Sequence, residues 1–251
     1  MKKTEWRVVP FAENNAFKNM ALDEAVSWEI AKGGSLPTIR FYGWKPSAVS
    51  IGYFQSIEKE VKLRECEALG VDVVRRRTGG GAVYHDNAGE ITYSVIAPQS
   101  FFPEDIIASY RLICGWIVDA FGQLGLKTEF KPINDVILEG KKVSGNAQTR
   151  RNGVLLQHGT ILYDLDVAKM FGVLNVSAEK ISDKLIKSVE ERVTSVTRHS
   201  KAPKKHVYDA LVWAFTRGKD WSFGNYSEKE TEGAEELAER RYSSREWNFM
   251  R

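Results

Sequence analysis

The sequence predicts an α+β (mixed α/β) fold in which mixed β-sheets are flanked by helices. Two patterns lead to this fold class. Short runs of alternating apolar residues recur along the chain, and longer segments with helical spacing of apolar residues lie between them. The composition agrees, because 43% hydrophobic and 27% charged residues in a chain of 251 are typical of a soluble globular protein.

Strands and helices are expected to alternate through the first hundred residues. Asn15 is a favourable N-cap, and the helix that follows it should end at Gly33 and Gly34. Gly70 should end a second, amphipathic helix. The predicted elements are, in order, strand 6–10, helix 15–32, strands 38–42 and 48–53, helix 57–69, and strands 71–77, 82–84 and 90–96.

The second part of the chain contains the clearest helix and a predicted hairpin. Residues 105–124 carry apolar side chains at helical spacing. Glu139 and Gly140 form the expected turn of the hairpin. The remaining predictions are strands 135–138, 142–147 and 153–163, an exposed loop at 198–205, a mostly helical remainder, and a capping box of Ser227 and Glu230.

Residues 75–86 form the most informative stretch, Arg-Arg-Arg-Thr-Gly-Gly-Gly-Ala-Val-Tyr-His-Asp. Consecutive glycines expose backbone N–H groups, and arginines can hold phosphate or carboxylate. The stretch is neither a P-loop nor a Rossmann fingerprint, because the glycines run into a strand-like segment. We interpret it as a cradle for an anionic ligand such as a nucleotide phosphate. A glycine-rich hairpin turn with solvated arginines is the alternative.

Residues 134–148 contain a lysine beside small residues. Lys142 is followed by Val143, Ser144 and Gly145, which leave room for a ligand close to the backbone. Strand alternation places Lys142 and Ser144 on one face and Lys141 and Val143 on the other. A buried Val143 would therefore turn Lys142 toward a cleft. Alternatively, both lysines belong to an exposed hairpin turn.

A polar interruption marks the apolar strand that follows. Gln157, His158, Gly159 and Thr160 stand where apolar residues would be expected. This pattern indicates a kink or the close approach of a ligand. The alternative is an ordinary hydrogen-bonded core histidine.

Several functional classes are disfavoured. The two cysteines, Cys66 and Cys114, suggest no disulfide framework and are interpreted as small buried residues in a reducing cytosol. Histidines and cysteines show no metal-binding spacing, and no Gly-x-Ser-x-Gly elbow occurs. A net charge of +3 is too mild to imply nucleic-acid binding but favours an acidic protein partner. No signal peptide or membrane span is expected, so we predict a cytoplasmic protein.

Taken together, these stretches resemble the lipoate–protein ligases. The matching pieces are residues 76–86, Asn134-Asp135 with residues 142–147, and residues 158–160. Weaker similarity at residues 19–24, 49–52 and 245–249 extends the resemblance over nearly the whole chain. It implies a biotin/lipoate ligase-type catalytic domain spanning residues 1–251. The C-terminal accessory domain of such ligases is expected to be absent, because the chain stops at Arg251, shortly after Phe249.

The resemblance also implies an activity. ATP and Mg²⁺ would activate lipoate to lipoyl-AMP, and the lipoyl group would pass to a lysine of an acceptor. The implied acceptors are lipoyl domains of 2-oxoacid dehydrogenase E2 subunits and the H protein of glycine cleavage. A separate small protein is expected to supply the accessory domain in trans for the activation step. No prosthetic group, nucleic acid or membrane is implied.

The resemblance assigns site residues at matching positions. Lys142 would be the catalytic cation, Asp135 a Mg²⁺ ligand, and Val83, Val143 and Leu155 would line an apolar slot. The implied ATP and lipoyl-AMP site comprises Arg75, Arg76, Arg77, Thr78, Gly79, Gly80, Gly81, Val83, His85, Asn134, Asp135, Lys142, Ser144, Gly145, Ala147, His158, Gly159 and Thr160.

Three other functions compete with this one. An octanoyl or lipoyl transferase of the same superfamily would use no ATP and would pass the acyl group through a cysteine thioester. We take this class to be disfavoured, because both cysteines precede the lysine motif. A biotin ligase would be expected to carry a different phosphate loop. A non-catalytic lipoate-binding protein would not require the full set of polar residues.

Overall fold

The structure, a computed structural model, describes residues 4–175 and 191–251. Its strands are β1 (Glu5–Asn14), β2 (Thr38–Trp44), β3 (Ala48–Ile51), β4 (Asp72–Arg75), β5 (Val83–His85), β6 (Glu90–Pro98), β7 (Thr128–Lys131), β8 (Asp135–Leu138), β9 (Lys141–Arg151), β10 (Val154–Leu162) and β11 (Asp220–Phe223). They form an eight-stranded sheet, β11-β1-β2-β6-β10-β9-β8-β7, and a three-stranded sheet, β4-β3-β5. Both sheets contain parallel and antiparallel pairs, so the predicted mixed fold is confirmed.

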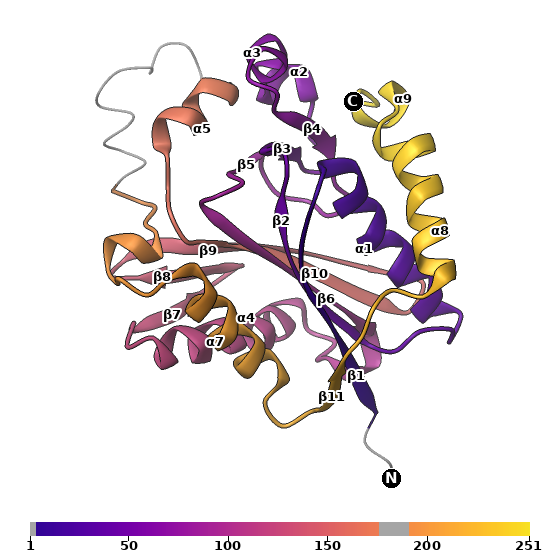
Figure 1. Ribbon diagram of the computed structural model, residues 1–251, viewed down its shortest axis with the longest axis vertical. Helices are drawn as coiled ribbons and strands as arrows, with labels where there is room; N and C mark the ends of the chain where they lie inside the picture. Colours follow the sequence, from indigo (N-terminus) through magenta and orange to yellow (C-terminus); the bar gives the residue numbers. More distant parts are fainter. Residues whose placement is uncertain (1–3, 176–190) are drawn as a thin grey trace.

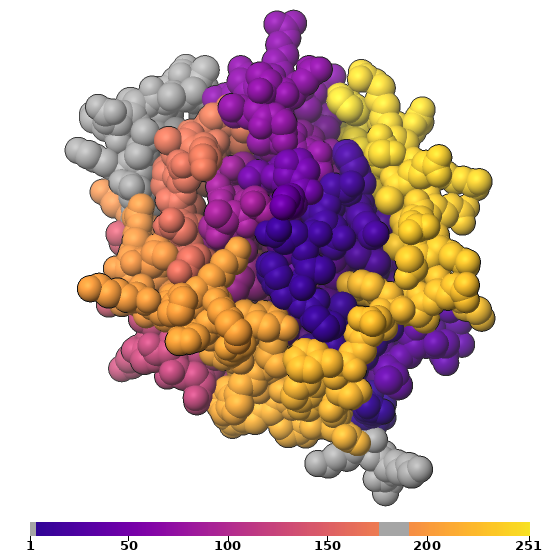
Figure 2. Space-filling view, in the orientation of Figure 1, coloured from indigo at the N-terminus to yellow at the C-terminus, as the bar shows by residue number. Residues whose placement is uncertain are grey.

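Helices cover both faces of the large sheet (Figure 1). They are α1 (Ala16–Ala31), α2 (Ile57–Glu60), α3 (Leu63–Ala68), α4 (Ile106–Gln123), α5 (Val167–Val173), α7 (Lys204–Thr216), α8 (Glu228–Leu237) and α9 (Arg245–Asn248), with the short 3₁₀ helices η1 (Gln99–Phe101) and η3 (Val196–Arg198) and the π-helix η4 (Ala238–Tyr242). Helices α4 and α7 pack on one face, and α1, α8 and the small sheet lie over the other. Figure 2 shows the C-terminal helices, in yellow, lying along α1, in indigo.

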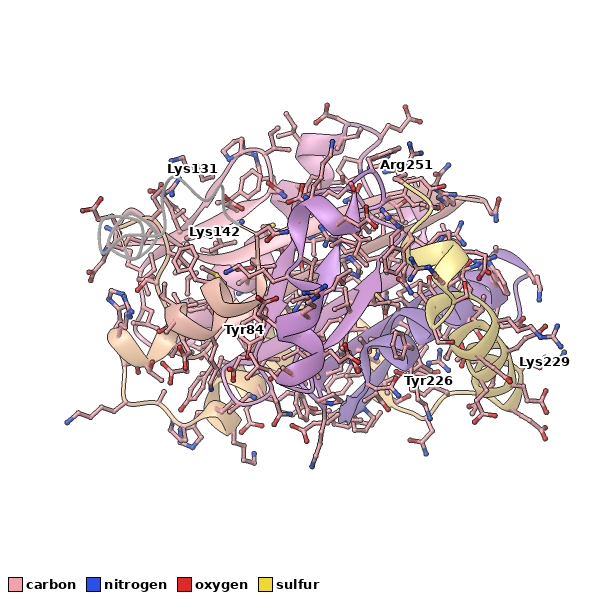
Figure 3. The ribbon with its side chains drawn as sticks, turned by 90° about the horizontal axis from the view of Figure 1, so that it is seen from above. Tyr84, Lys131, Lys142, Tyr226, Lys229 and Arg251 are labelled. Atoms are coloured by element: carbon pink, nitrogen blue, oxygen red, sulfur yellow. The ribbon has the colours of Figure 1, made fainter. Side chains whose placement is uncertain are left out.

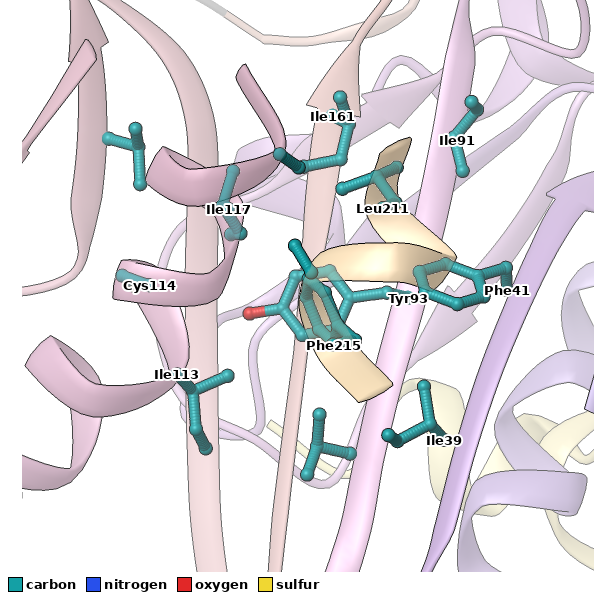
Figure 4. Packing of buried hydrophobic residues seen from close by; sticks show 14 of the residues in the cluster. Ile39, Phe41, Ile91, Tyr93, Ile113, Cys114, Ile117, Ile161, Leu211 and Phe215 are labelled. Atoms are coloured by element: carbon teal, nitrogen blue, oxygen red, sulfur yellow. The ribbon is translucent and has the colours of Figure 1, made fainter. Parts of the chain in front are cut away.

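The main hydrophobic core lies between the large sheet and helices α4 and α7 (Figure 4). Phe215 of α7 meets the rings of Tyr93 and Phe41 edge-on, with centroid distances of 4.9 and 5.4 Å. Ile113 and Ile117 of α4 are completely buried beside them. Because strand side chains alternate, the neighbouring residues of the same strands point to the opposite face. That second face is polar in places, and the candidate site lies on it.

The predicted helix caps are confirmed. The side chain of Asn15 accepts a hydrogen bond from the first turn of α1, and Ser227 and Glu230 form a complete capping box. Asp105, which was not predicted as a cap, accepts a hydrogen bond from the first turn of α4. These contacts involve residues three apart in the chain, so local sequence is sufficient to predict them. None of the helices in residues 4–175 and 191–251 combines the length and apolarity that a membrane crossing requires.

Other element predictions need correction. The helix expected at 57–69 is interrupted, because Val61 leaves the helix and forms a β-bridge with Leu174. Strands β7 and β11 were not predicted. The expected loop at 198–205 begins within η3 and ends within α7, and part of the expected helical remainder, residues 176–190, lies outside the described residues.

Candidate active site

A cavity of about 330 Å³ lies on the polar face of the large sheet, beneath the small sheet. The glycine-rich segment 79–81, here called the glycine loop, forms one wall together with β5, and strands β9 and β10 form another. Trp44, Leu162 and Met170 make part of the lining apolar. In Figure 3, the lining residues Lys142 and Tyr84 lie on the left of the view, whereas Arg251 lies to the right. The cavity therefore combines an apolar region with polar groups, as sites for amphipathic ligands do.

Lys142 reaches the cavity because β9 contains a bulge. The register against β8 shifts between Val136 and Ile137, and the extra residue on β9 is Val143. Lys142 and Gly145 consequently line the cavity, while Val143 is completely buried in the core against α4. Lys142 lines the cavity, as predicted. The strict alternation of faces along β9, from which we predicted this orientation, fails at the bulge.

Three neighbouring predictions are corrected by the same geometry. Ser144 was expected on the face of Lys142, but it is paired with Val136, which belongs to the core, and is completely buried. Val143 and Leu155 were expected to line an apolar slot, but both lie in the core on the opposite face of the sheet. Val83 does line the cavity.

The Lys142 ammonium is held in a defined position. Its Nζ atom lies 2.7 Å from Oδ1 of Asp135. The backbone N–H of Lys142 donates to the carbonyl of residue 192, and the backbone carbonyl of Lys142 accepts from the N–H of residue 194. The side chain crosses Gly145, where an added Cβ would come within 2.5 Å of Cε and 2.6 Å of Nζ. A glycine at 145 is therefore what allows the ammonium to lie at the cavity wall.

Asp135 is a poor magnesium site in this arrangement. Its carboxylate is already paired with an ammonium, whereas Mg²⁺ needs several oxygen ligands in octahedral geometry. In the described ranges, no group of three or more His, Cys, Asp and Glu residues could hold a metal ion. The described residues do not fit the predicted Mg²⁺ role of Asp135, and no step is assigned to a metal.

The three arginines before the glycine loop form hydrogen bonds or ion pairs with other groups of the protein. Arg75 is completely buried and donates to the carbonyls of Gly52, Tyr53, Gln55, Trp247 and Asn248. Arg77 is paired with Glu24. Neither Arg75 nor Arg77 lines the cavity, so the expectation that they contact an anionic ligand there is not supported by their position.

Arg76 does lie in the cavity wall, but its donors are directed at the protein. It bonds to the backbone and hydroxyl of Ser50, to the Thr78 hydroxyl, and to the carbonyls of Gly79 and Gly81. Burial lowers the pKa of Arg76 to about 10, so it remains a cation at neutral pH. The Arg76 guanidinium therefore holds the carbonyls of the glycine loop and places a fixed positive charge beside it.

The glycine loop is packed closely onto β3. A Cβ on Gly52 would collide with the Gly80 carbonyl, and Gly80 itself has a φ of +94°, which favours glycine. Within the described part of the chain, the amide N–H groups of residues 79–81 donate no hydrogen bond. Gly80 and Gly81 line the cavity, whereas Thr78 and Gly79 lie behind it. Two residues of the cavity wall therefore have backbone N–H groups without an acceptor in the described residues.

His85 is part of a buried network in the cavity wall. Its Nε2 atom lies 2.8 Å from Oγ of Ser50, and its Nδ1 atom lies 2.8 Å from Oε1 of Glu90. Ser50 and Glu90 also line the cavity, although sequence reasoning did not select either as a site residue. The available signal was a polar side chain within an otherwise apolar strand, at Ser50 between Val49 and Ile51.

His158 forms a second network of the same kind. Its Nε2 atom lies 2.7 Å from Oγ1 of Thr78, and its Nδ1 atom lies 3.0 Å from Oδ2 of Asp23 in α1. Burial lowers the pKa of His158, while Arg40 at 2.8 Å keeps the pKa of Asp23 below its usual range despite complete burial. The network connects Thr78, the residue before the glycine loop, to β10 and α1.

The remaining predicted residues gather around Lys142. Asn134, Ala147, Gly159 and Thr160 all line the cavity. Gly159 has no room for a Cβ, because the Asn146 side chain occupies that space. Asn146 in turn donates to the Asn134 carbonyl at 2.9 Å. The structure therefore brings together residues from the loop before β8 and from β9 and β10, as their grouping in the sequence implied.

Both cysteines lie away from the cavity. Cys66 packs with residues of α2 and α5, and Cys114 packs in the main core, so their predicted burial is confirmed. Burial raises the pKa of the Cys66 thiol to about 11 and that of Cys114 to about 12. At neutral pH both are therefore un-ionised thiols with low nucleophilicity.

Comparisons with known proteins place the chain in a family. Residues 15–216 match the model of the lipoyl protein ligase A/B catalytic domain. Octanoyltransferase LipM of Kyrpidia tusciae is 37% identical, covering 98% of this chain and 99% of the relative. Octanoyltransferase LipM of Geobacillus kaustophilus is 35% identical over the full length of both. The structure of a bi-partite lipoate protein ligase from Thermoplasma acidophilum is similar with a TM-score of 0.87 at 35% identity, covering 98% of this chain and 96% of that one.

The curated relatives contradict the prediction that this chain activates lipoate with ATP to form lipoyl-AMP. They are octanoyltransferases, and they favour the alternative, an octanoyl or lipoyl transferase that uses no ATP. The mistake has a physical origin. A glycine loop and a fixed lysine stabilise negative charge in any acyl transfer, so they do not distinguish a ligase from a transferase. The chain belongs to the lipoyl protein ligase A/B catalytic domain family.

Proposed function

We propose that this protein transfers an octanoyl or lipoyl group from an activated donor to a lysine amine of an acceptor domain, without consuming ATP. The Lys142 ammonium, fixed at the wall of a partly apolar cavity that the glycine loop also lines, supports acyl transfer, and the octanoyltransferase relatives support transfer without ATP. Because amide formation from a free carboxylate needs an energy source, the acyl group must arrive already activated. An acyl thioester is the donor class that meets this requirement.

The cavity suits a medium-length acyl chain. Trp44, Val83, Leu162 and Met170 supply an apolar surface, and the volume is about 330 Å³. Each methylene group removed from water contributes about 0.8 kcal/mol to binding. The chain would lie along these residues and place its carbonyl near Lys142.

The polar groups would act on the reacting carbonyl. When an amine attacks the acyl carbon, the carbonyl oxygen becomes an oxyanion. The Lys142 ammonium and the N–H groups of Gly80 and Gly81 are fixed donors that favour this developing charge. Lysine suits the role because its ammonium is a compact charge.

The proposed acceptor is a lipoyl domain, such as that of a 2-oxoacid dehydrogenase E2 subunit or the H protein. A related bi-partite ligase was studied together with its E2 lipoyl domain, which supports this choice. A net charge of +3 favours an acidic acceptor surface. The accessory protein was predicted for an ATP-dependent activation step. Transfer from a pre-activated donor should need no second protein beyond the acceptor.

The test is mass spectrometry of a lipoyl domain incubated with the purified chain and an octanoyl thioester, without ATP. We expect the acceptor to gain one octanoyl group on its target lysine, and a Lys→Arg acceptor to gain none. Parallel reactions contain free lipoate or octanoate with ATP and Mg²⁺. Modification in those reactions, with none from the thioester, would reject the transferase proposal.

Gly145→Ala should lower the transfer rate about 100-fold, because the new Cβ would push the Lys142 side chain from its position and misplacement of a catalytic group by about 1 Å has that effect. Initial rates with saturating thioester measure the change. Gly115→Ala in α4 is the matched control, since its Cβ would meet nothing within 4 Å. Equal rates for Gly145→Ala and the control would show that Lys142 does not need this position.

The double substitution Cys66→Ser, Cys114→Ser should retain transfer activity, because both thiols are buried away from the cavity. A small loss of stability is expected from placing hydroxyls in apolar surroundings. Transfer assays and a thermal melt of the same preparation separate the two effects. A folded but inactive double variant would show that a cysteine carries the acyl group.

A further inference from the structure

The location of both cysteines leaves open which group, if any, holds the acyl chain during transfer. We propose that Ser50 is the covalent acyl carrier, activated by His85 and Glu90. The proposal rests on the proposed transferase function and adds a nucleophile to it. Ser50 is a hydroxyl of the cavity wall, and both of its network partners line the same cavity.

The three side chains stand in the order that nucleophilic catalysis requires. Oγ of Ser50 is 2.8 Å from Nε2 of His85, and Nδ1 of His85 is 2.8 Å from Glu90. In the tautomer with the proton on Nδ1, the imidazole donates to Glu90 and accepts the serine proton at Nε2. This is the geometry of a nucleophile, a base and a group that orients the base.

The surroundings hold the imidazole in place. Trp44 stacks on the His85 ring with a centroid distance of 4.0 Å and an interplanar angle of 15°. The Thr92 hydroxyl donates to the same Glu90 oxygen at 2.5 Å, and Trp44 donates to Thr92 at 2.7 Å. These contacts leave the ring little freedom to turn away from Ser50. Such pre-organisation is what a base needs in order to act on one defined proton.

Positive charge and N–H donors surround the same hydroxyl. Arg76 donates to Oγ of Ser50 at 3.1 Å, which favours negative charge on that oxygen. The glycine loop, whose amide N–H groups are free of protein acceptors in the described residues, passes over Gly52, which directly follows the strand of Ser50. A carbonyl bound at Ser50 would therefore lie near donors able to stabilise its oxyanion.

A comparison with the second network singles out Ser50. Thr78, His158 and Asp23 have the same connectivity, but the Thr78 side chain does not line the cavity. Thr92 lines the cavity but donates its proton to Glu90 rather than to an imidazole. Ser50 is 1% exposed, so an ester formed there would be shielded from bulk water and preserved for attack by an amine.

The proposed reaction has two balanced steps. Oγ of Ser50 attacks the thioester carbonyl carbon and its proton passes to Nε2 of His85. The carbon–sulfur bond breaks, and the leaving thiolate takes that proton. In the second step the neutral amine of the acceptor lysine attacks the ester carbon and gives a proton to His85. The carbon–oxygen bond breaks, Ser50 recovers the proton, and the amide remains on the acceptor.

The experiment is intact-mass and tandem mass spectrometry of the protein after incubation with octanoyl thioester in the absence of acceptor. We expect one octanoyl group on Ser50, lost when a lipoyl domain is added. Ser50→Ala and His85→Gln should form no adduct. Ser50→Cys keeps the side-chain size and should form an adduct that neutral hydroxylamine cleaves, whereas the serine ester should resist it. The exposed Ser222→Ala is the control and should acylate normally.

The outcomes separate this proposal from the transferase function. Normal octanoyl transfer to the acceptor by a folded Ser50→Ala variant, or an adduct mapped elsewhere, would overturn the role of Ser50 and leave the transferase function standing. Absence of transfer from any thioester by the unaltered protein would overturn both. A Ser50→Cys variant that is folded but never acylated would likewise reject the assignment.

Discussion

Replacing Lys142 with alanine should lower the rate of acyl transfer about 10²–10³-fold, a loss of ~3–4 kcal/mol of transition-state stabilisation. The ammonium is held by Asp135 at the cavity wall, and removing it takes away a fixed charge directed at the developing oxyanion. The folded state should change little, since the Lys142 side chain is 38% exposed. Initial rates and thermal melts on the same preparation test both statements.

Lys141→Ala is the matched control for this experiment. Lys141 is the neighbouring residue on β9 but does not line the cavity. Its removal should therefore leave transfer within a few-fold of the unaltered rate. An equal loss of activity in the two variants would contradict the assignment of the central cation to Lys142.

Arg75→Met should destabilise the protein by at least about 3 kcal/mol, and it removes no group that lines the cavity. The guanidinium bonds to five backbone carbonyls, and each buried acceptor left without a donor costs about 1–3 kcal/mol. Urea unfolding monitored by tryptophan fluorescence gives the free energy of unfolding.

Arg217→Met provides a comparison for Arg75, because its side chain is 62% exposed and paired with Asp119 at 3.6 Å. Surface pairs of this kind contribute about 0–1 kcal/mol. If Arg75→Met were as stable as Arg217→Met but bound the thioester more weakly, the sequence-based assignment of Arg75 to the ligand site would be restored.

Features that depend on near neighbours in the chain were predictable. The caps of α1 and α8 and the turn at Glu139-Gly140 each involve residues a few positions apart. The grouping of Lys142, His158 and the glycine loop was also predicted, through resemblance to a family. Both kinds of prediction use information that a linear pattern contains.

Features that depend on distant partners were not predictable. The bulge at Val143 arises from the register of two paired strands, and it reversed the expected orientation of Ser144. The arginines follow the same rule. Arg75 meets residues more than 170 positions away, so three adjacent arginines gave no sign that they would bond to the protein itself. The partners of Ser50 are 35 and 26 positions distant.

The Arg75 contacts give the last helix a mechanical connection to the ligand-binding wall. One guanidinium holds the backbone of α9 and the backbone at Gly52, and the Gly80 carbonyl rests on Gly52. Tension applied to α9, for example by a fused tag or a bound protein, would be transmitted toward the glycine loop through Arg75 and through the contacts that Trp247 and Asn248 make with Arg75 and Tyr53. If such tension changes the affinity of the loop for a ligand, then by thermodynamic reciprocity the ligand changes the stability of α9 by the same coupling free energy. The rate of amide hydrogen exchange in residues 245–248 would then change when a ligand binds in the cavity, although those residues do not line it.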